Sequence, residues 1–281
     1  KQAILFAKNN AAVDIVCSKF TGLIPFSILE KLHTKEELSA EENEIYSKSK
    51  ERIYAIAQLA YDNEVSLFVD AEESWIQHPL DELTFDLMAK FNTKKPIIYN
   101  TVQFYRKDRL QFFKNVVNSA KQVGFIYAAK LVRGAYMDKE AKRAKKMNYE
   151  NPIQTSKEDT DKDYNEAVKF AIENISSVAI CVATHNEEST LLATTLMQEK
   201  KIEHNHPHIH FSQLYGMSDN ITFNLAVEGY HTHKYMPYGP VKDVIPYLIR
   251  RAQENTSVAG QMSRELKLLK EEVKRRKLFV L

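Results

Sequence analysis

The sequence is poor in glycine, and this scarcity excludes two common ways of binding a nucleotide. Only seven of the 281 residues are glycine, and no two of them form a Gly-x-Gly pair. The dinucleotide fingerprint of Rossmann folds and the P-loop of nucleotidases both need closely spaced glycines. A nucleotide cofactor would therefore have to be held by side chains instead of a glycine-rich turn.

Cysteine, long apolar runs and excess charge are also scarce. Cys17 and Cys181 each lie in an apolar run, which is typical of reduced core residues rather than a disulfide framework. No apolar stretch reaches the ~18 residues of a membrane span, and no signal peptide is visible. The 39 basic and 37 acidic residues nearly balance, so bulk charge does not predict nucleic-acid binding. Because the chain starts with Lys1 instead of Met, we expect a truncation at the N-terminus.

What the chain does have is an alternation of short apolar runs with longer amphipathic segments. Such alternation predicts parallel strands covered by helices on both faces, an α/β fold. Helical spacing of apolar residues occurs in segments 41–63, 107–123 and 164–175. The predicted strands are residues 13–18, 66–70, 96–102, 126–132, 177–183, 209–213 and a weaker one at 233–236.

Seven or eight strand–helix units favour a closed (β/α)8 barrel over an open, doubly wound sheet. Barrels of this type run to ~250 residues as a single domain, so we predict one barrel domain over residues 1–281. Two domains remain an alternative on length alone. The charged segment 138–163 is predicted to be an active-site loop with a helix. The alternative is a solvent-exposed segment that takes no part in the active site.

Polar side chains follow the ends of six predicted strands. The catalytic residues of a barrel enzyme lie at the carboxyl ends of its strands, so this repetition predicts an active site there. Near the C-terminus, Arg250 and Arg251 are followed by Glu254 on a predicted helix, where paired guanidinium groups suit a carboxylate ligand and a solvated helix face is the alternative. The strand ends carry Asp70 to Glu73, Gln103 and Tyr105, Lys130 to Tyr136, Thr184 to Asn186, Gln213 to Met217, and Tyr235 to Gly239.

Two further segments have competing interpretations. The basic, amphipathic tail 261–281 either docks on the barrel or contacts a membrane surface or a partner. Four histidines between His204 and His210 suggest a metal, but they approach the start of a strand, the stability face of a barrel, so we interpret them as a polar loop and predict no metal site.

Together the strand-end blocks resemble the signature blocks of the proline dehydrogenase family, from about residue 13 to residue 258 and in family order. Lys19 and Thr21 resemble its first-strand block, and the segment from Asn151 to Asn165 resembles its monofunctional branch. The resemblance implies FAD as cofactor, L-proline as substrate and Δ1-pyrroline-5-carboxylate as product. A cofactor is also chemically required, because no side chain accepts two electrons from a carbon–nitrogen bond.

The resemblance also assigns site residues. It implies that Lys19, Arg250 and Arg251 clamp the proline carboxylate, and that Tyr235 favours proline over hydroxyproline. Around the proline ring it places Asp70, Leu131, Ala135, Tyr136, Leu214 and Tyr235. For the flavin it implies contacts with Asp70, Gln103, Lys130, Val132, Arg133, Gly134, Ala135, Thr184, His185, Asn186, Ser212, Arg251 and Glu254.

A quinone is the electron acceptor that this resemblance implies, which requires peripheral membrane contact. We expect a bacterial cytoplasmic enzyme at the inner membrane, with the matrix side of the mitochondrial inner membrane as the alternative. A metal-dependent barrel hydrolase and a catalytically silent flavin- or metabolite-binding barrel are the rival functions.

Overall fold

A computed structural model describes residues 1–237, 239–242, 244–245, 248–249, 267 and 269–277. Within these residues, parallel strands form one sheet in the order β1-β2-β3-β4-β5-β6-β7. Their register is continuous from Ile15 opposite Ser66 to Leu214 opposite Tyr235. The strands are β1 (Ile15–Ser18), β2 (Ser66–Val69), β3 (Ile98–Gln103), β4 (Tyr127–Val132), β5 (Val178–Ala183), β6 (Ile209–Leu214) and β7 (Thr232–Tyr235).

This order confirms the barrel and excludes the open, doubly wound alternative. A doubly wound sheet reverses its strand order at a switch point, whereas here each strand pairs with the next one in the sequence. The sheet is curled, as contacts between side chains near its first and last strands show. His233 of β7 lies 3.3 Å from the Asp14 carboxylate just before β1.

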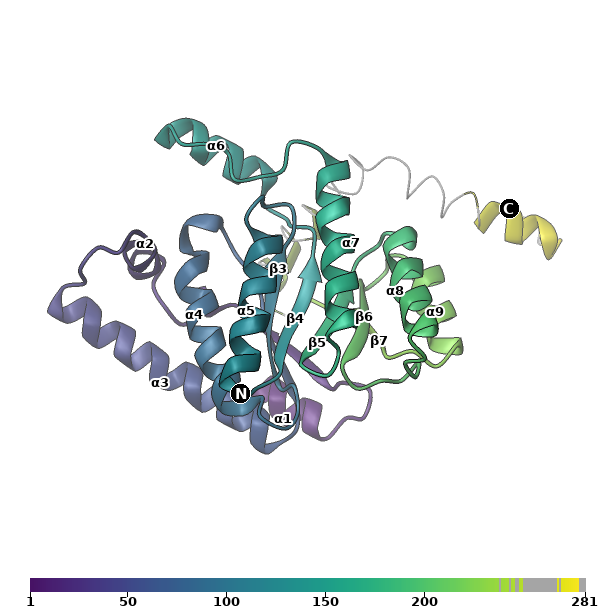
Figure 1. The fold of residues 1–281 in the computed structure, drawn as a ribbon, viewed down its shortest axis with the longest axis horizontal. Helices are drawn as coiled ribbons and strands as arrows, with labels where there is room; N and C mark the ends of the chain where they lie inside the picture. Colours follow the sequence, from purple (N-terminus) through teal and green to yellow (C-terminus); the bar gives the residue numbers. More distant parts are fainter. Residues whose placement is uncertain (238, 243, 246–247, 250–266, 268, 278–281) are drawn as a thin grey trace.

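Helices cover the outside of the sheet and alternate with the strands (Figure 1). Each predicted strand exists within about two residues of its expected ends. The apolar runs are clearest for β3, β4 and β5, whose residues are largely buried. The helices are α1 (Gln2–Lys8), α2 (Phe26–Thr34), α3 (Ala40–Asp62), α4 (Ser74–Phe91), α5 (Arg109–Val123), α6 (Met137–Met147), α7 (Lys157–Glu173), α8 (Glu187–Glu199) and α9 (Asp219–Val227), with a short 3-10 turn at Phe20–Gly22.

Segment 138–163 is more ordered than the predicted loop with one helix. It holds most of α6 and also the first turns of α7, which begins at Lys157 instead of residue 164. The Ser156 side chain caps α7 by accepting a 3.0 Å hydrogen bond from the backbone N–H of Asp159. These first turns are charged and lack apolar periodicity, so the helical spacing that marks the rest of α7 does not extend into them.

Two hydrophobic clusters lie on opposite sides of the sheet. The larger one fills the layer between the sheet and the helices, with Ile98, Leu131 and Ile180 among its members. The smaller one fills the interior of the curled sheet, where Phe68 stacks on Tyr99 at a centroid distance of 4.3 Å beside Cys181. Both cysteines are free thiols, and burial raises the pKa of each to about 12.

The C-terminal tail is partly within the described residues. Positions 269–275 are helical there, and Leu269 is exposed. Whether this helix docks on the barrel or contacts another surface stays a prediction. Among the helices that the structure describes, none is long and apolar enough to cross a bilayer.

Candidate active site

A buried ion pair lies inside the curled sheet at the carboxyl ends of its strands. Lys130 extends from β4 and donates a hydrogen bond to Asp70, which directly follows β2. The two side chains are 12% and 13% exposed. Burial by itself lowers the pKa of Lys130, but the adjacent Asp70 carboxylate outweighs it and raises the pKa above its usual value. The ammonium also lies 5.7 Å from the ring centroid of Tyr235 at the end of β7.

The segment after β2 also positions Lys19, which follows β1. Glu72 accepts hydrogen bonds from the Thr21 hydroxyl at 2.7 Å and from the Thr21 N–H at 3.4 Å. These bonds fasten the turn that carries Lys19 to the end of β2. The Lys19 ammonium in turn donates to the Tyr136 hydroxyl at 3.3 Å. Burial lowers the pKa of Lys19, but the Asp70 carboxylate and Tyr136 raise it overall.

Arg133 is a rigidly held cation just after β4. Its guanidinium donates to Asp161 of α7 at 2.6 Å, to the Thr184 hydroxyl at 2.7 Å and to the Ser189 hydroxyl at 2.9 Å. The same group lies 4.4 Å from the ring centroid of Tyr164. Three donors bonded to fixed partners orient the planar fork, and two N–H groups make no bond to another residue that the structure describes, so they could hold an anionic ligand.

Next to this cation, His185 is an uncharged group at neutral pH. Its Nδ1 lies 2.9 Å from the Ser218 hydroxyl. Burial, with a smaller repulsion from Lys234, lowers the pKa of His185 to about 4. Among the residues predicted to contact the flavin, the neutral His185 after β5 would contribute hydrogen bonds, whereas Arg133 after β4 would supply positive charge.

Gly134 is the position where only glycine fits. Its φ of +141° lies in a region that other residues avoid, and a Cβ atom there would come within 2.4 Å of the Tyr105 ring. Tyr105 is 2% exposed, and its backbone N–H donates to the Arg133 carbonyl at 2.7 Å. The ring thus packs flat against the backbone between Arg133 and Ala135.

Most of the predicted site residues share this end of the barrel. Leu131 differs, because it is fully buried in the outer cluster on the opposite strand face from Lys130. Its contact with substrate stays a prediction. Arg250, Arg251 and Glu254 lie outside the described residues. The predicted residues found within or just after the strands at this end are Lys19, Asp70, Gln103, Lys130, Val132, Arg133, Gly134, Ala135, Tyr136, Thr184, His185, Asn186, Ser212, Leu214 and Tyr235.

Several residues that hold this arrangement were not predicted from the sequence. Asp161 and Ser189 orient Arg133, and Ser218 contacts His185. Asp161 belongs to the 151–165 segment that resembles the family's monofunctional branch, so the sequence did mark the region that contains it. Ser189 and Ser218 are ordinary polar residues near helix starts, and nothing in the sequence distinguishes them from caps.

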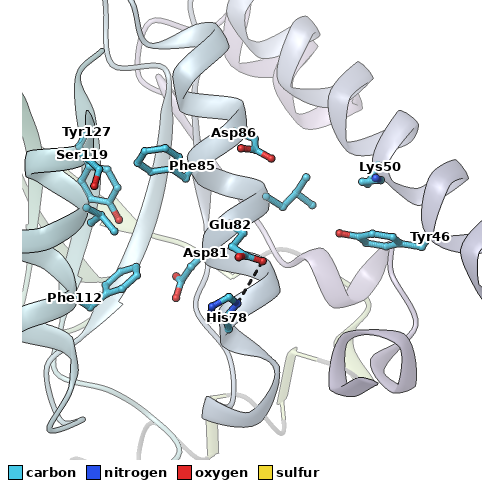
Figure 2. Close-up of a pocket in the computed structure, with 12 residues that line it drawn as sticks. Tyr46, Lys50, His78, Asp81, Glu82, Phe85, Asp86, Phe112, Ser119 and Tyr127 are labelled. Carbon is cyan, nitrogen blue, oxygen red and sulfur yellow. Dashed lines mark ion pairs between the residues drawn. The ribbon is translucent and has the colours of Figure 1, made fainter. Parts of the chain in front are cut away.

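A cavity of about 570 Å³ opens on the outer side of the barrel, between α3, α4 and α5 (Figure 2). The Asp81 carboxyl group in its wall is satisfied by Arg109 at 2.6 Å, Asn100 at 2.9 Å and Gln77 at 3.0 Å. None of the predicted site residues lines this cavity. We therefore place the candidate active site inside the sheet instead.

The histidine-rich segment lies at the opposite end of the barrel, at the start of β6, as the loop interpretation expects. His204 contacts the carbonyl of Glu228 at 2.6 Å, and His208 contacts that of Ile175 at 2.8 Å. Within the residues that the structure describes, no three His, Cys, Asp or Glu side chains are grouped as metal ligands.

His210 of β6 predicts how folding stability depends on pH. Its Nδ1 lies 2.9 Å from His233 Nε2, and burial together with repulsion from His233 and His231 lowers its pKa to about 3. The unfolded chain takes up this proton below pH ~6.5, so stability falls as pH drops from there towards 3. Burial alone would raise the pKa of Asp14, but its His233 contacts outweigh burial and lower it. The stability that Asp14 contributes is therefore present above its unfolded pKa of ~3.9 and is lost as pH falls below that value.

We expect His210→Gln to flatten this dependence. For each unit that the pH falls between 6.5 and 5, this one group lowers the free energy of unfolding of the wild-type protein by up to ~1.4 kcal/mol. Urea unfolding at pH 7 and pH 5 measures the difference, and His78→Gln on the exposed side of α4 is the control. An unchanged pH dependence in His210→Gln would contradict the buried, neutral state of this histidine.

Fold and site together define a class: an α/β-barrel protein with charged and polar side chains gathered at the carboxyl ends of parallel strands. Within this class, the chain belongs to the proline dehydrogenase family, whose model, described as "Proline dehydrogenase", matches residues 7–264. The predicted family is thereby confirmed.

Relatives of known name agree with this membership. The chain is 36% identical to mitochondrial proline dehydrogenase 1 of Dictyostelium discoideum over 98% of its own length and 56% of the relative. It is 39% identical to human mitochondrial proline dehydrogenase 1, over 89% of its own length and 41% of the relative. It is also 39% identical to hydroxyproline dehydrogenase of Xenopus laevis, over 90% of its own length and 55% of the relative. The chain thus spans about half the length of these relatives.

Solved structures support the fold. The chain aligns with proline utilization A of Bdellovibrio bacteriovorus, a protein inactivated by N-propargylglycine, with a TM-score of 0.78 and 24% identity. This alignment covers 90% of the chain and 27% of the larger protein. At this level of identity the likeness establishes the barrel fold.

Proposed function

We propose that this protein oxidises L-proline to Δ1-pyrroline-5-carboxylate with FAD, the first step of proline catabolism. Family membership supplies the substrate class. The observation that carries the proposal is the buried Lys130–Asp70 pair under Tyr235, which places a fixed cation inside the barrel where a flavin and a small amino acid would meet. FAD would supply the two-electron acceptor that side chains lack, taking a hydride at N5.

The residues at the strand ends suit a flavin nucleotide. Gln103 is 3% exposed, and its amide makes no hydrogen bond to another described residue, so it is available for the polar edge of the ring system. Lys130 would place a positive charge beside the ring system, and such a charge would favour its acceptance of electrons. Arg133 and His185 would hold the phosphate and sugar portions through an oriented guanidinium and a neutral imidazole.

We assign proline binding to the opposite side of the same space. Lys19 would pair with the proline carboxylate, completing a clamp with Arg250 and Arg251. Ala135, Leu214 and the Tyr235 ring would contact the apolar ring carbons, and Tyr136 would keep the Lys19 ammonium oriented at 3.3 Å. A substrate fixed at its acid end presents one ring carbon to the acceptor, and such positioning contributes much of the rate of a hydride transfer.

An anaerobic titration tests the proposed oxidation directly. The purified protein is expected to be yellow, or to become so with added FAD, and to bleach when L-proline is added without oxygen. A flavin-loaded protein that proline does not bleach would fit a silent flavin-binding barrel and contradict the proposal. A protein that takes up no FAD and hydrolyses substrates only with added metal would fit the hydrolase alternative.

Substrate preference is a separate prediction, because relatives named for proline and for hydroxyproline are about equally similar to this chain. In the proposed site, the Tyr235 ring would lie beside the ring position that carries the hydroxyl group in trans-4-hydroxyproline. We expect kcat/KM for proline to exceed that for trans-4-hydroxyproline by roughly 10–100-fold. Tyr235→Ser is expected to narrow the ratio, and equal values in the wild-type protein would refute the assignment.

We further propose that the electrons pass to a membrane quinone, which calls for peripheral contact with a bilayer. Several relatives are named as mitochondrial proteins, including the proline dehydrogenases of Dictyostelium discoideum, human and Arabidopsis thaliana. These relatives support the mitochondrial alternative better than the expected bacterial cytoplasm, so we propose the mitochondrial inner membrane as the place of action.

A further inference from the structure

Helix α6 stands out from the body of the barrel beyond the carboxyl ends of the strands (Figure 1). Only two of its residues, Glu140 and Ala144, are buried. One alanine contributes little hydrophobic stabilisation, so apolar packing alone does not fix this helix. The exposed Lys139 ammonium also pairs at 2.6 Å with Glu73, whose side chain is 9% exposed, and the solvent around the ammonium weakens this pair.

Glu140 makes the most buried contact of the helix. Its side chain is inaccessible to solvent, and its two oxygens accept hydrogen bonds from the Ser74 N–H at 2.7 Å and the Ser74 hydroxyl at 2.6 Å. Ser74 is the first residue of α4, whose own N-cap residue, Glu73, makes no side-chain capping bond. Glu140 therefore caps α4 from a different helix, satisfying a donor that the helix itself leaves open.

This contact lies one helical turn from the candidate substrate residues. The Glu140 N–H donates to the Tyr136 carbonyl at 2.9 Å, so anchoring Glu140 also fixes the backbone of Tyr136. The Tyr136 hydroxyl accepts from Lys19. A chain of bonded groups thus runs from the start of α4 through the start of α6 to the proposed carboxylate-binding lysine.

We propose that Glu140 is a positioning residue: by capping α4, it holds Tyr136 against Lys19 and so determines how well proline is bound. The inference rests on the proposed proline oxidation. Glu140 itself is buried away from solvent and acts only through Tyr136 and Lys19. Its loss should therefore weaken substrate binding more than the chemical step.

Glu140→Gln tests this, since glutamine keeps the size of the side chain but only one acceptor oxygen. We expect its KM for proline to rise by at least about tenfold while kcat changes by less than about threefold. Ser74→Ala should raise KM by a smaller factor, because the N–H donor remains. Ser74→Thr retains the hydroxyl and should restore a near wild-type KM. Asp138→Asn, an exposed carboxyl group in the first turn of the same helix, is the matched control.

Limited trypsin digestion gives a readout that does not depend on activity. Helix α6 contains five Lys or Arg residues, and we expect cleavage within it to be faster in Glu140→Gln than in Asp138→Asn. If Glu140→Gln matches Asp138→Asn in both KM and cleavage, or loses kcat with KM unchanged, the inference is wrong. If the wild-type protein does not oxidise proline, the proposed function fails, and unchanged cleavage would separately refute the anchoring role.

Discussion

Replacing Lys130 with methionine, or Asp70 with leucine, is expected to destabilise the folded protein by about 3–5 kcal/mol. Each change removes one partner of the buried pair and leaves the other charge without compensation in a site about one-eighth exposed. The double variant has two apolar side chains of similar size in contact, so we expect it to lie within about 1 kcal/mol of the wild-type protein. Urea unfolding of the four proteins completes the cycle.

The same set of variants separates stability from catalysis. If the proposed function holds, all three should lose proline oxidation by roughly 10²-fold or more. The proposed cation at the flavin is absent from Lys130→Met and from the double variant, and in Asp70→Leu it has lost the carboxylate that orients it. Glu44→Gln removes an exposed pair with Lys48 and should change stability by only about 0.3–0.5 kcal/mol. A double variant as unstable as the single ones would contradict the coupling, and an active Lys130→Met would contradict the role of Lys130 at the flavin.

Gly134→Ala is expected to have the second large effect. The free energy of unfolding should fall by about 3 kcal/mol or more, and proline oxidation should be lost. The added Cβ atom meets the Tyr105 ring at 2.4 Å, and the backbone at φ +141° is strained for any residue but glycine. Neither Tyr105 nor the strand end can move freely, because the Tyr105 carbonyl also accepts a 2.7 Å bond from the Gln154 N–H. Thermal unfolding and proline-dependent bleaching measure the two losses.

Other glycines allow the two causes to be separated. Gly124 has a φ of +94° and no atom near its added Cβ, so Gly124→Ala measures backbone strain alone, at about 1–2 kcal/mol. Gly22→Ala meets neither strain nor contact and should be nearly neutral. The loss caused by Gly134→Ala should be smaller in the Tyr105→Ala background than in the wild-type protein, because the ring that the added Cβ meets is gone. An equal loss in both backgrounds would indicate that the ring contact is not the cause.

The strands and their positions could be predicted from the sequence because parallel strands buried on both faces are continuous apolar runs. Residues 126–132 and 177–183 are examples, and β4 and β5 lie within them. The ends of these runs also predicted the candidate site, since the carboxyl ends of barrel strands converge. The start of α7 escaped prediction, because its first turns are charged and are stabilised by the Ser156 cap instead of apolar packing.

By itself, the sequence determined the positions of the strands, the family and the strand ends that carry the polar residues, because each of these follows from local patterns repeated along the chain. Only the tertiary structure decided the strand order and which polar groups touch. The contacts of Asp70 with Lys130, Thr21 with Glu72, and Ser74 with Glu140 join positions 60, 51 and 66 residues apart. Such pairs depend on how the sheet curls and where α6 docks, and no local spacing encodes them.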